Sequence, residues 1–319
     1  MPVLATIVTL PDNRSIIVPD TRRLEFESLD GTSLIDWAGD EFIALNGITG
    51  IDVPPRDVIR RQLPGLPGSR IDEIRDLERQ VFIPVHTRPA DRDWRTHLKQ
   101  LASVRSFLNY RDRDYVAAEG TFDLVGYGDG TRRVLRCTYL SGMEGDYGSD
   151  QMFGWWRADG VTLLAVDPYC RGSEWSTPVV QLPIVAPFLS NDPADGFPRA
   201  ITASVALGAN MPVIIGGDVP TPGTVELIGP ADSTHITSPA GLDVTLDAID
   251  TGDLLVLQTG RTKSLTLNGV RADELLIGDS PQWAPFQPGA TTVSIVMTGA
   301  SSDTRARVYG TELFETLWG

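Results

Sequence analysis

The chain has 319 residues, 41% of them hydrophobic, which is enough for about two folded domains with ordinary cores. Its formal net charge of −15 argues against sequence-specific binding of nucleic acid, because clustered Lys and Arg supply most of that affinity. The longest apolar runs fall far short of the roughly 20 residues that cross a bilayer, and the N-terminus lacks a signal-peptide pattern. We therefore expect a folded protein without a membrane span.

The first domain is predicted over residues 1–172 and reads as α+β, with one helix against antiparallel strands. Strand patterns begin it at residues 4–10, 15–18, 23–29 and 42–45. The segment from Pro54 to Gly68 is interpreted as an exposed loop or arm, because its prolines and glycines disfavour regular structure. Beyond it, Val81, Ile83 and Val85 alternate with Phe82 and Pro84, and this proline predicts a sheet edge or a strand end. A sheet edge could serve as a contact surface.

The main helix of this domain is predicted to follow Asp91, a suitable N-cap. Its apolar residues recur at three- and four-residue steps and predict one stripe that covers a sheet. The stripe consists of Trp94, Leu98, Leu101, Val104 or Arg105, and Leu108.

A hairpin is predicted next, with strands at 121–127 and 131–140 on either side of Gly128-Asp129-Gly130. Arg132 and Arg133 in its second strand indicate a solvated or subunit-facing surface. Two further strands are expected at 150–156 and 161–166, around a turn at residues 158–160.

A proline-rich connector is predicted over residues 173–198, and a second domain over residues 199–319. Short strands separated by turn residues make this domain a β-sandwich or jelly roll. They are predicted at 201–207, 213–215, 224–228, 242–246, 254–258, 264–267, 274–277 and 292–297. Near the terminus, 306–309 reads as a strand and Leu313, Phe314 and Leu317 have helical spacing; this segment could complete the sandwich or fold onto a neighbouring subunit.

No residue pattern indicates catalysis, a cofactor or a metal. The three histidines, His86, His97 and His235, lie far apart and are expected at a surface or interface. Glu144 and Asp146 could form the carboxylate pair of a glycosidase, and Asp146, Tyr147 and Asp150 of the same loop could bind calcium. Scattered acidic residues of a solvated loop explain them as well.

The two cysteines, Cys137 and Cys170, do not have the spacing of a zinc site. Two buried free thiols are expected, while a disulfide between neighbouring strands remains an alternative.

A carbohydrate site is the second functional class that the sequence allows. Trp283 and Phe286 form an aromatic cluster in the loop between residues 278 and 289. An aromatic face beside polar groups could bind a sugar, whereas the same two rings could instead close one end of the sandwich core. Exposure of Trp283 distinguishes the two interpretations.

The order of these features resembles the distal tail protein (Dit) family of long-tailed bacteriophages. The most specific similarity lies in the second domain, in four short segments and their order along the chain. These are Met211-Pro212-Val213-Ile214-Ile215-Gly216-Gly217, Gly252-Asp253-Leu254-Leu255-Val256, Leu267-Asn268-Gly269 and Phe286-Gln287-Pro288-Gly289. The resemblance implies a ring-forming N-terminal domain followed by a galectin-like β-sandwich.

The same resemblance implies a non-enzymatic virion protein at the distal end of the phage tail. It would form a homo-hexameric ring that joins the tail tube protein to the tail tip or baseplate proteins and surrounds the channel for the tape measure protein and DNA. Candidate interface residues are Val81, Ile83, Val85, Leu66, Asp129, Arg132 and Arg133. The alternative is a tail module that recognises host cell-wall carbohydrate through Trp283 and Phe286.

Overall fold

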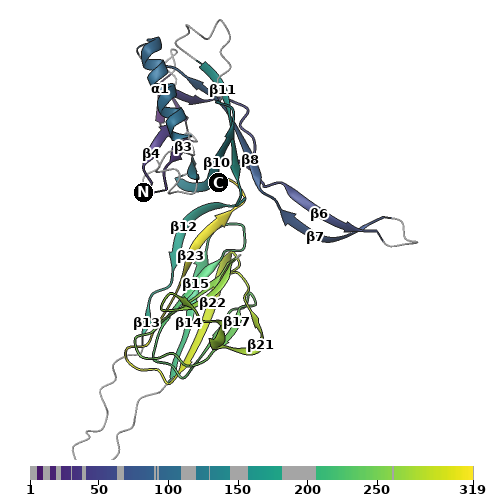
Figure 1. The fold of residues 1–319 in the computed structure, drawn as a ribbon, viewed down its shortest axis with the longest axis vertical. Helices are drawn as coiled ribbons and strands as arrows, with labels where there is room; N and C mark the ends of the chain where they lie inside the picture. Colours follow the sequence, from purple (N-terminus) through teal and green to yellow (C-terminus); the bar gives the residue numbers. More distant parts are fainter. Residues whose placement is uncertain are drawn as a thin grey trace, which may run out of the picture. The chain divides into compact units, whose positions relative to one another are not determined.

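The computed structural model (Figure 1) describes residues 6–9, 15–18, 23–29, 31–37, 41–62, 68–89, 91, 93–108, 120–128, 130–143, 157–181, 206–260 and 262–318. Strands dominate these residues, which confirms the predicted mainly β fold with one main helix. The chain divides into two units. The first unit contains Met1–Gly172 and Phe314–Gly319, and the second contains Ser173–Leu313.

Two antiparallel sheets form most of the first unit, and strand β10 takes part in both. One has the order β4-β3-β9-β10, and the other has the order β10-β11-β8-β5. Their bounds are β3 Arg23–Glu27, β4 Ser33–Asp36, β5 Phe42–Ala44, β8 Arg79–Thr87, β9 Phe122–Gly128, β10 Thr131–Ser141 and β11 Arg157–Ala165. The strands β1 (Thr6–Thr9) and β2 (Ser15–Val18) form a separate antiparallel pair.

The inner faces of both sheets and the helix α1 (Trp94–Phe107) enclose the core of the first unit. Strand alternation turns every second side chain inward, where burial of apolar surface stabilises the fold. The cluster includes Leu24, Phe26, Val81, Ile83, Val85, Leu101, Val104, Leu108, Phe122, Leu124, Leu135, Cys137, Val161 and Leu163.

The buried face of α1 differs from the predicted stripe. Leu101 is 2% exposed, but Trp94 and Leu98 are 50% and 46% exposed. His97 lies inward instead, with its Nε2 atom 3.0 Å from Oγ1 of Thr87. This contact satisfies two polar groups that are costly to bury unpaired. The prediction was therefore wrong for the first turn of the stripe and for the surface position of His97.

Strand β8 is an interior strand, so the predicted sheet edge is wrong. It pairs with β11 along its whole length and with β5 at its C-terminal end. Pro84 fits because the β5 ladder ends next to it: the Leu45 amide donates to the Pro84 carbonyl, and no N–H is needed from the proline. The three inward side chains are each 0% exposed and belong to the core, not to an interface: Val81, Ile83 and Val85.

The turn predicted at residues 158–160 is also wrong, because β11 runs through it. Gly160 pairs with Pro84 of β8. A Cβ atom at Gly160 would lie 2.4 Å from the Phe82 ring. The glycine is therefore explained by close packing against an aromatic side chain and not by a change of chain direction.

Two further antiparallel sheets form the second unit. One has the order β14-β22-β16-β17-β21, and the other contains β20-β19-β18-β15-β23, with β13 also paired to β23. The bounds are β13 Val180–Gln181, β14 Ala206–Ile215, β15 Gly223–Ile228, β16 Ser233–Thr237, β17 Asp243–Leu246, β18 Leu254–Thr259, β19 Lys263–Leu267, β20 Val270–Arg271, β21 Leu276–Gln282, β22 Gly289–Thr298 and β23 Arg305–Phe314. A short 3₁₀ helix, η2 (Asp273–Leu275), precedes β21.

The inward side chains of these two sheets form one hydrophobic cluster, as expected of a sandwich. The strands predicted at 201–207 and 213–215 are joined in the single strand β14, which continues through Pro212. Among the strands that the structure describes, β14 lies at the edge of its sheet and pairs with β22 alone, so this proline can be accommodated there.

The end of the chain returns to the first unit. After β23, residues Phe314–Gly319 belong to that unit, and Leu317 is 1% exposed in its core. The Leu317 amide donates to the Ile51 carbonyl at 2.9 Å. The predicted helical spacing is thus wrong, and the second unit ends at Leu313 instead of continuing to the terminus.

Strand β12 (Cys170–Ser176) and β13 occupy the start of the predicted connector, whose residues from 182 onward lie outside the described residues. The predicted strand at 150–156 and the loop with Glu144 and Asp146 also lie outside them.

Candidate functional site: a charged sheet face and an exposed hairpin

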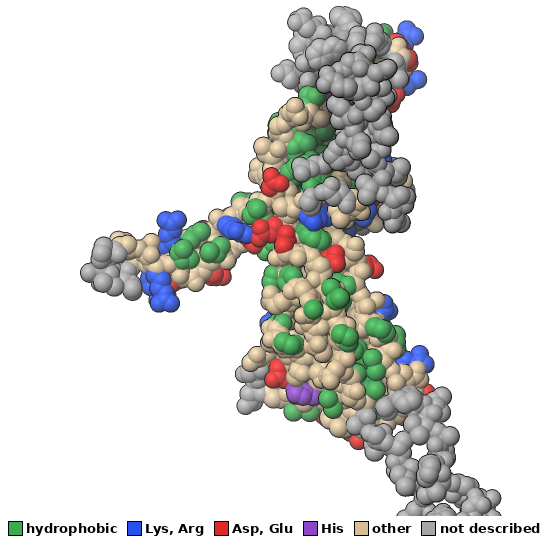
Figure 2. All heavy atoms as spheres, turned by 180° about the vertical axis from the view of Figure 1, so that it is seen from behind, with side chains coloured by type: hydrophobic (Ala, Val, Ile, Leu, Met, Phe, Trp, Pro, Cys, Tyr) green, Lys and Arg blue, Asp and Glu red, His purple; other side chains and the backbone are tan. Residues whose placement is uncertain are grey.

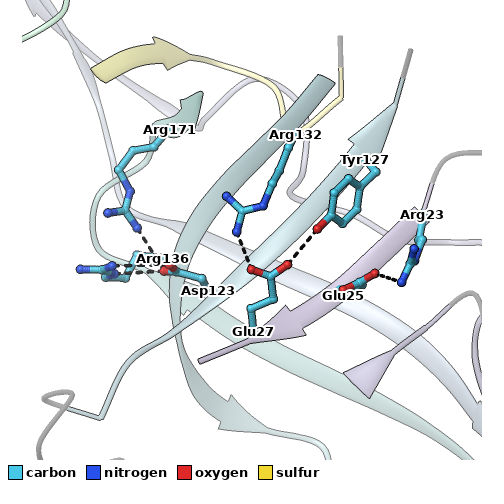
Figure 3. Close-up of polar contacts among 8 residues, drawn as sticks. All are labelled: Arg23, Glu25, Glu27, Asp123, Tyr127, Arg132, Arg136 and Arg171. Atoms are coloured by element: carbon cyan, nitrogen blue, oxygen red, sulfur yellow. Dashed lines mark hydrogen bonds and ion pairs between the residues drawn. The ribbon is translucent and has the colours of Figure 1, made fainter. Parts of the chain in front are cut away.

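The outer face of β3, β9 and β10 carries a row of charged side chains (Figure 3). Residues that are opposite one another in paired strands share a face, and the register places Glu27 opposite Asp123, and Asp123 opposite Arg136. Glu25 lies two residues before Glu27 and therefore on the same face. This row was not predicted from the sequence, because β3 and β9 are about 100 residues apart in the chain and no short sequence pattern indicates how they pair.

Two of the carboxylates in the row are nearly fully buried. Glu27 is 4% exposed; it accepts a 2.9 Å hydrogen bond from the Tyr127 hydroxyl and pairs with Arg132. Burial and the hydrogen bond to Glu27 raise the pKa of Tyr127. Glu25 is 3% exposed and pairs with Arg23. Each carboxylate has a cationic partner, which a buried charge requires.

Asp123 is shared between two arginines. Its Oδ1 atom lies 3.1 Å from Arg136 Nε and 3.1 Å from an Arg171 guanidinium nitrogen. Burial lowers the pKa of Arg171, and Asp123 opposes that effect. Arg136 and Arg171 remain 40% and 34% exposed, while Asp123 is 12% exposed in its side chain.

The row therefore has buried carboxylates beneath partly exposed guanidinium groups. A guanidinium has five N–H donors, and the pairs described here use only some of them. Arginines held in place in this way can accept a further anionic group from a partner with little loss of side-chain entropy. The face is a candidate contact surface for an acidic protein segment.

A second candidate surface is the antiparallel hairpin formed by β6 (Arg56–Arg61) and β7 (Arg70–Asp76), which we call the arm. It forms a two-stranded sheet of its own and extends from the other strands of the first unit (Figure 1). The segment predicted as a loop or arm thus contains a regular strand. Residues 63–67 between the strands lie outside the described residues.

The arm exposes large apolar side chains. Ile71 and Ile74 are 55% and 56% exposed, and Ile59 is 36% exposed. Figure 2 shows hydrophobic side chains on this ribbon between basic ones. An isolated two-stranded ribbon is only marginally stable in water, and contiguous exposed apolar groups mark interaction sites. The arm is therefore the better candidate for a subunit contact.

The remaining predicted interface residues have different surroundings. Leu66 and Asp129 lie outside the described residues. Arg132 is half-exposed in the charged row. Arg133 is 9% exposed, and its guanidinium carbon lies 3.7 Å from the centroid of the Phe314 ring of the same chain. The interface role predicted for Arg133 is wrong, because its side chain is already buried within its own unit.

The two aromatic residues of the predicted sugar site do not form a common exposed face. Phe286 is 0% exposed and packs edge-on against Trp175, with 5.7 Å between ring centroids. Trp283 is partly buried against the same core. A fully buried ring cannot stack on a sugar, so Phe286 has the core role that the sequence left as an alternative.

Both cysteines, Cys137 and Cys170, are buried free thiols, as expected. Burial raises the pKa of the Cys137 thiol well above its usual range. Across the described residues, no group of three or more His, Cys, Asp or Glu side chains is arranged to hold a metal ion. Of the helices in that part of the chain, none is long and apolar enough to cross a membrane.

No family model matches the chain, and no curated protein sequence does so either. Among solved structures, the fold is similar to the Dit protein of phage SPP1, described as a paradigm of the hub adsorption apparatus in phages that infect Gram-positive hosts. That similarity has a TM-score of 0.59 at 14% sequence identity and covers 92% of this chain and 100% of the SPP1 protein.

Two structures of the phage P2 baseplate in its activated conformation, with Ca and with Sr, give TM-scores of 0.46 and 0.47 at 8% identity. Each of these comparisons covers 91% of this chain and 98% of the other. At these TM-scores we base no argument on them. The similarity to SPP1 Dit confirms, for the fold, the resemblance inferred from the sequence.

Proposed function

We propose that this protein is a non-enzymatic structural component of a phage tail. In this proposal, six copies form a closed ring at the distal end of the tail, between the tail tube protein and the proteins of the tip or baseplate. The ring surrounds the channel through which tape measure protein and DNA leave. The observation that carries the proposal is the fold similarity to SPP1 Dit over nearly the whole of both chains.

Two properties of the first unit support a ring of identical subunits. The arm exposes Ile71 and Ile74, which a second copy could cover. The charged row offers arginines to an acidic partner, and a chain of net charge −15 provides many acidic groups. The same net charge suits a channel that must release DNA, because a negative surface repels phosphate.

Native mass spectrometry of the purified protein, with negative-stain images, tests the proposal. We expect a ring of six with a mass of about 208 kDa, six times the 34.7 kDa of one chain. A protein that stays monomeric at high concentration, and also when mixed with its tail tube protein, would contradict it.

A paired substitution tests the role of the arm in that ring. Ile71→Asp with Ile74→Asp should abolish the ring, because a charge placed in an apolar contact must be desolvated without a partner. Ile214→Asp is the matched control, since Ile214 is 81% exposed on the sandwich. If the arm variant still forms rings as the control does, the arm is not part of the subunit interface.

A further inference from the structure

The root of the arm is held by an ion-pair network to which the end of the chain contributes. Arg56 begins β6 and pairs in register with Asp76, the last residue of β7. The Arg56 Nε atom donates to Asp76 Oδ1 at 2.9 Å, and its Nη2 atom donates to the Glu315 carboxylate. A single guanidinium therefore links both strands of the arm to the C-terminal segment Phe314–Gly319.

The second oxygen of Asp76 is held as well. The Tyr169 hydroxyl donates to Asp76 Oδ2 at 2.5 Å. Burial raises the pKa of Asp76, but the hydrogen bonds from Tyr169 and Arg56 outweigh it, and the pKa is lowered. Asp76 is thus fixed by the arm on one side and by the chain just before β12 on the other.

Beneath this pair lies Arg79, which is 1% exposed. Its two terminal nitrogens donate to the Asp52 carbonyl at 2.6 Å and the Glu315 carbonyl at 2.9 Å. Asp52 lies shortly before β6, so the chain that enters the arm and the C-terminal segment share one buried cation. Next to the Arg56–Asp76 pair, the Leu77 amide donates to the Pro55 carbonyl at 2.8 Å.

The C-terminal segment is itself rigidly placed on either side of Glu315. Leu317 is buried in the core of the first unit, and the ring of Phe314 packs under the Arg133 guanidinium. Glu315 is therefore held between two anchors, and its carboxylate projects toward the root of the arm.

We propose that Glu315 is a positioning residue for assembly: it fixes the direction in which the arm leaves the first unit. A two-stranded ribbon without other neighbours can swing about its root, and a swinging arm must be ordered each time a subunit joins a ring. Fixing it in advance reduces the entropic cost of association. The effect on association rests on the proposed ring, whereas the role of Glu315 in setting the direction of the arm does not.

The test measures arm direction and assembly separately. Spin labels at Asp57→Cys on the arm and Lys99→Cys on α1 report the distance between arm and body in the full chain. The native thiols are buried and do not compete for the label. In Glu315→Gln we expect the distance distribution to be at least about twofold broader, while the thermal unfolding of the protein stays within a few degrees.

Glu73→Gln is the matched control. It removes an exposed ion pair with Arg75 within the arm itself, where the two side chains lie 2.7 Å apart, and leaves the root untouched. It should not change the distance distribution. Arg56→Gln also removes the ion pair with Asp76, so it should broaden the distribution at least as much as Glu315→Gln does. The double variant should be no broader than Arg56→Gln alone, because Glu315 acts on the arm through Arg56.

Assembly is then read by native mass spectrometry. Glu315→Gln should raise the concentration for half-assembly by a factor of about two to five, as expected for one partly exposed ion pair per subunit. Rings in wild type with an unchanged distance distribution in Glu315→Gln would overturn the positioning role and leave the proposed function intact. A broadened distribution in a protein that forms no rings would support the positioning role and remove the proposed function.

Discussion

The substitution Leu317→Ala tests whether the last residues of the chain complete the first unit. Leu317 is 1% exposed, and packing around it is close, since a Cβ atom added at Gly126 of β9 would lie 2.7 Å from its side chain. Truncation of a buried leucine to alanine costs about 2–5 kcal/mol, from lost burial and the cavity that remains. We expect about 3 kcal/mol here.

For a unit of this size, each kcal/mol lowers the unfolding temperature by roughly 2–4 °C, so the first unit should melt about 6–12 °C earlier. Calorimetry of the full chain measures the shift, and hydrogen exchange identifies the unit that opens. Amides of β9 and β3 should lose protection, whereas those of the sandwich strand β22 should keep it. Val270→Ala, at a position 71% exposed, should change stability by less than about 0.5 kcal/mol.

The opposite pattern of exchange would refute this reasoning. If β22 lost protection and β9 did not, the C-terminal segment would belong energetically to the sandwich. If neither lost protection and the melting temperature stayed constant, Leu317 would not be buried in the folded protein.

Two further predictions concern the charged groups of the first unit. Glu27→Ala should cost about 1–3 kcal/mol in urea unfolding, because it leaves the Tyr127 hydroxyl without its acceptor, whereas the exposed Glu73→Ala should cost nothing measurable. The lowered pKa of Asp76 predicts an acid-sensitive arm root: its contribution to stability is fully present above the unfolded-state value of about 3.9 and is lost as pH falls through the lower folded-state value. Hydrogen exchange of the arm at pH 5 and at lower pH should show this loss, and Asp76→Asn should remove the pH dependence.

Local patterns predicted those elements whose partners are close in sequence. The hairpin of β9 and β10 follows from two apolar runs around Gly128-Asp129-Gly130, and the structure has strands at 122–128 and 131–141. The sandwich likewise follows from short alternating strands between turn residues, because the alternation of apolar and polar residues within each strand shows which face is buried. The exposed arm was predicted from Pro54 to Gly68, although its strands were not.

Non-local pairing explains the errors. A proline is excluded from an interior strand only where a neighbouring strand would need its missing N–H as a donor. At Pro84 no such donor is needed because the β5 ladder ends next to it, and the end of β5 cannot be read from the residues around Pro84. The burial of Glu25 and Glu27 depends on pairing with β9, about 100 residues later, and no local feature distinguishes them from solvated acids. Helical spacing at the terminus was misleading because Leu313 and Leu317 are buried in different units.

The first unit is thus made from two separate parts of the chain, and this affects how assembly can work. A chain that stopped at Leu313 would have the strands of the sandwich but would lack the Leu317 side chain in the core and the Glu315 carboxylate at the arm root. The same six residues therefore stabilise the unit that is proposed to form the ring and hold the element that is proposed to join its subunits. Under the proposed function, an arm with exposed Ile71 and Ile74 would be held in a binding-competent direction only in a chain that includes residues 314–319.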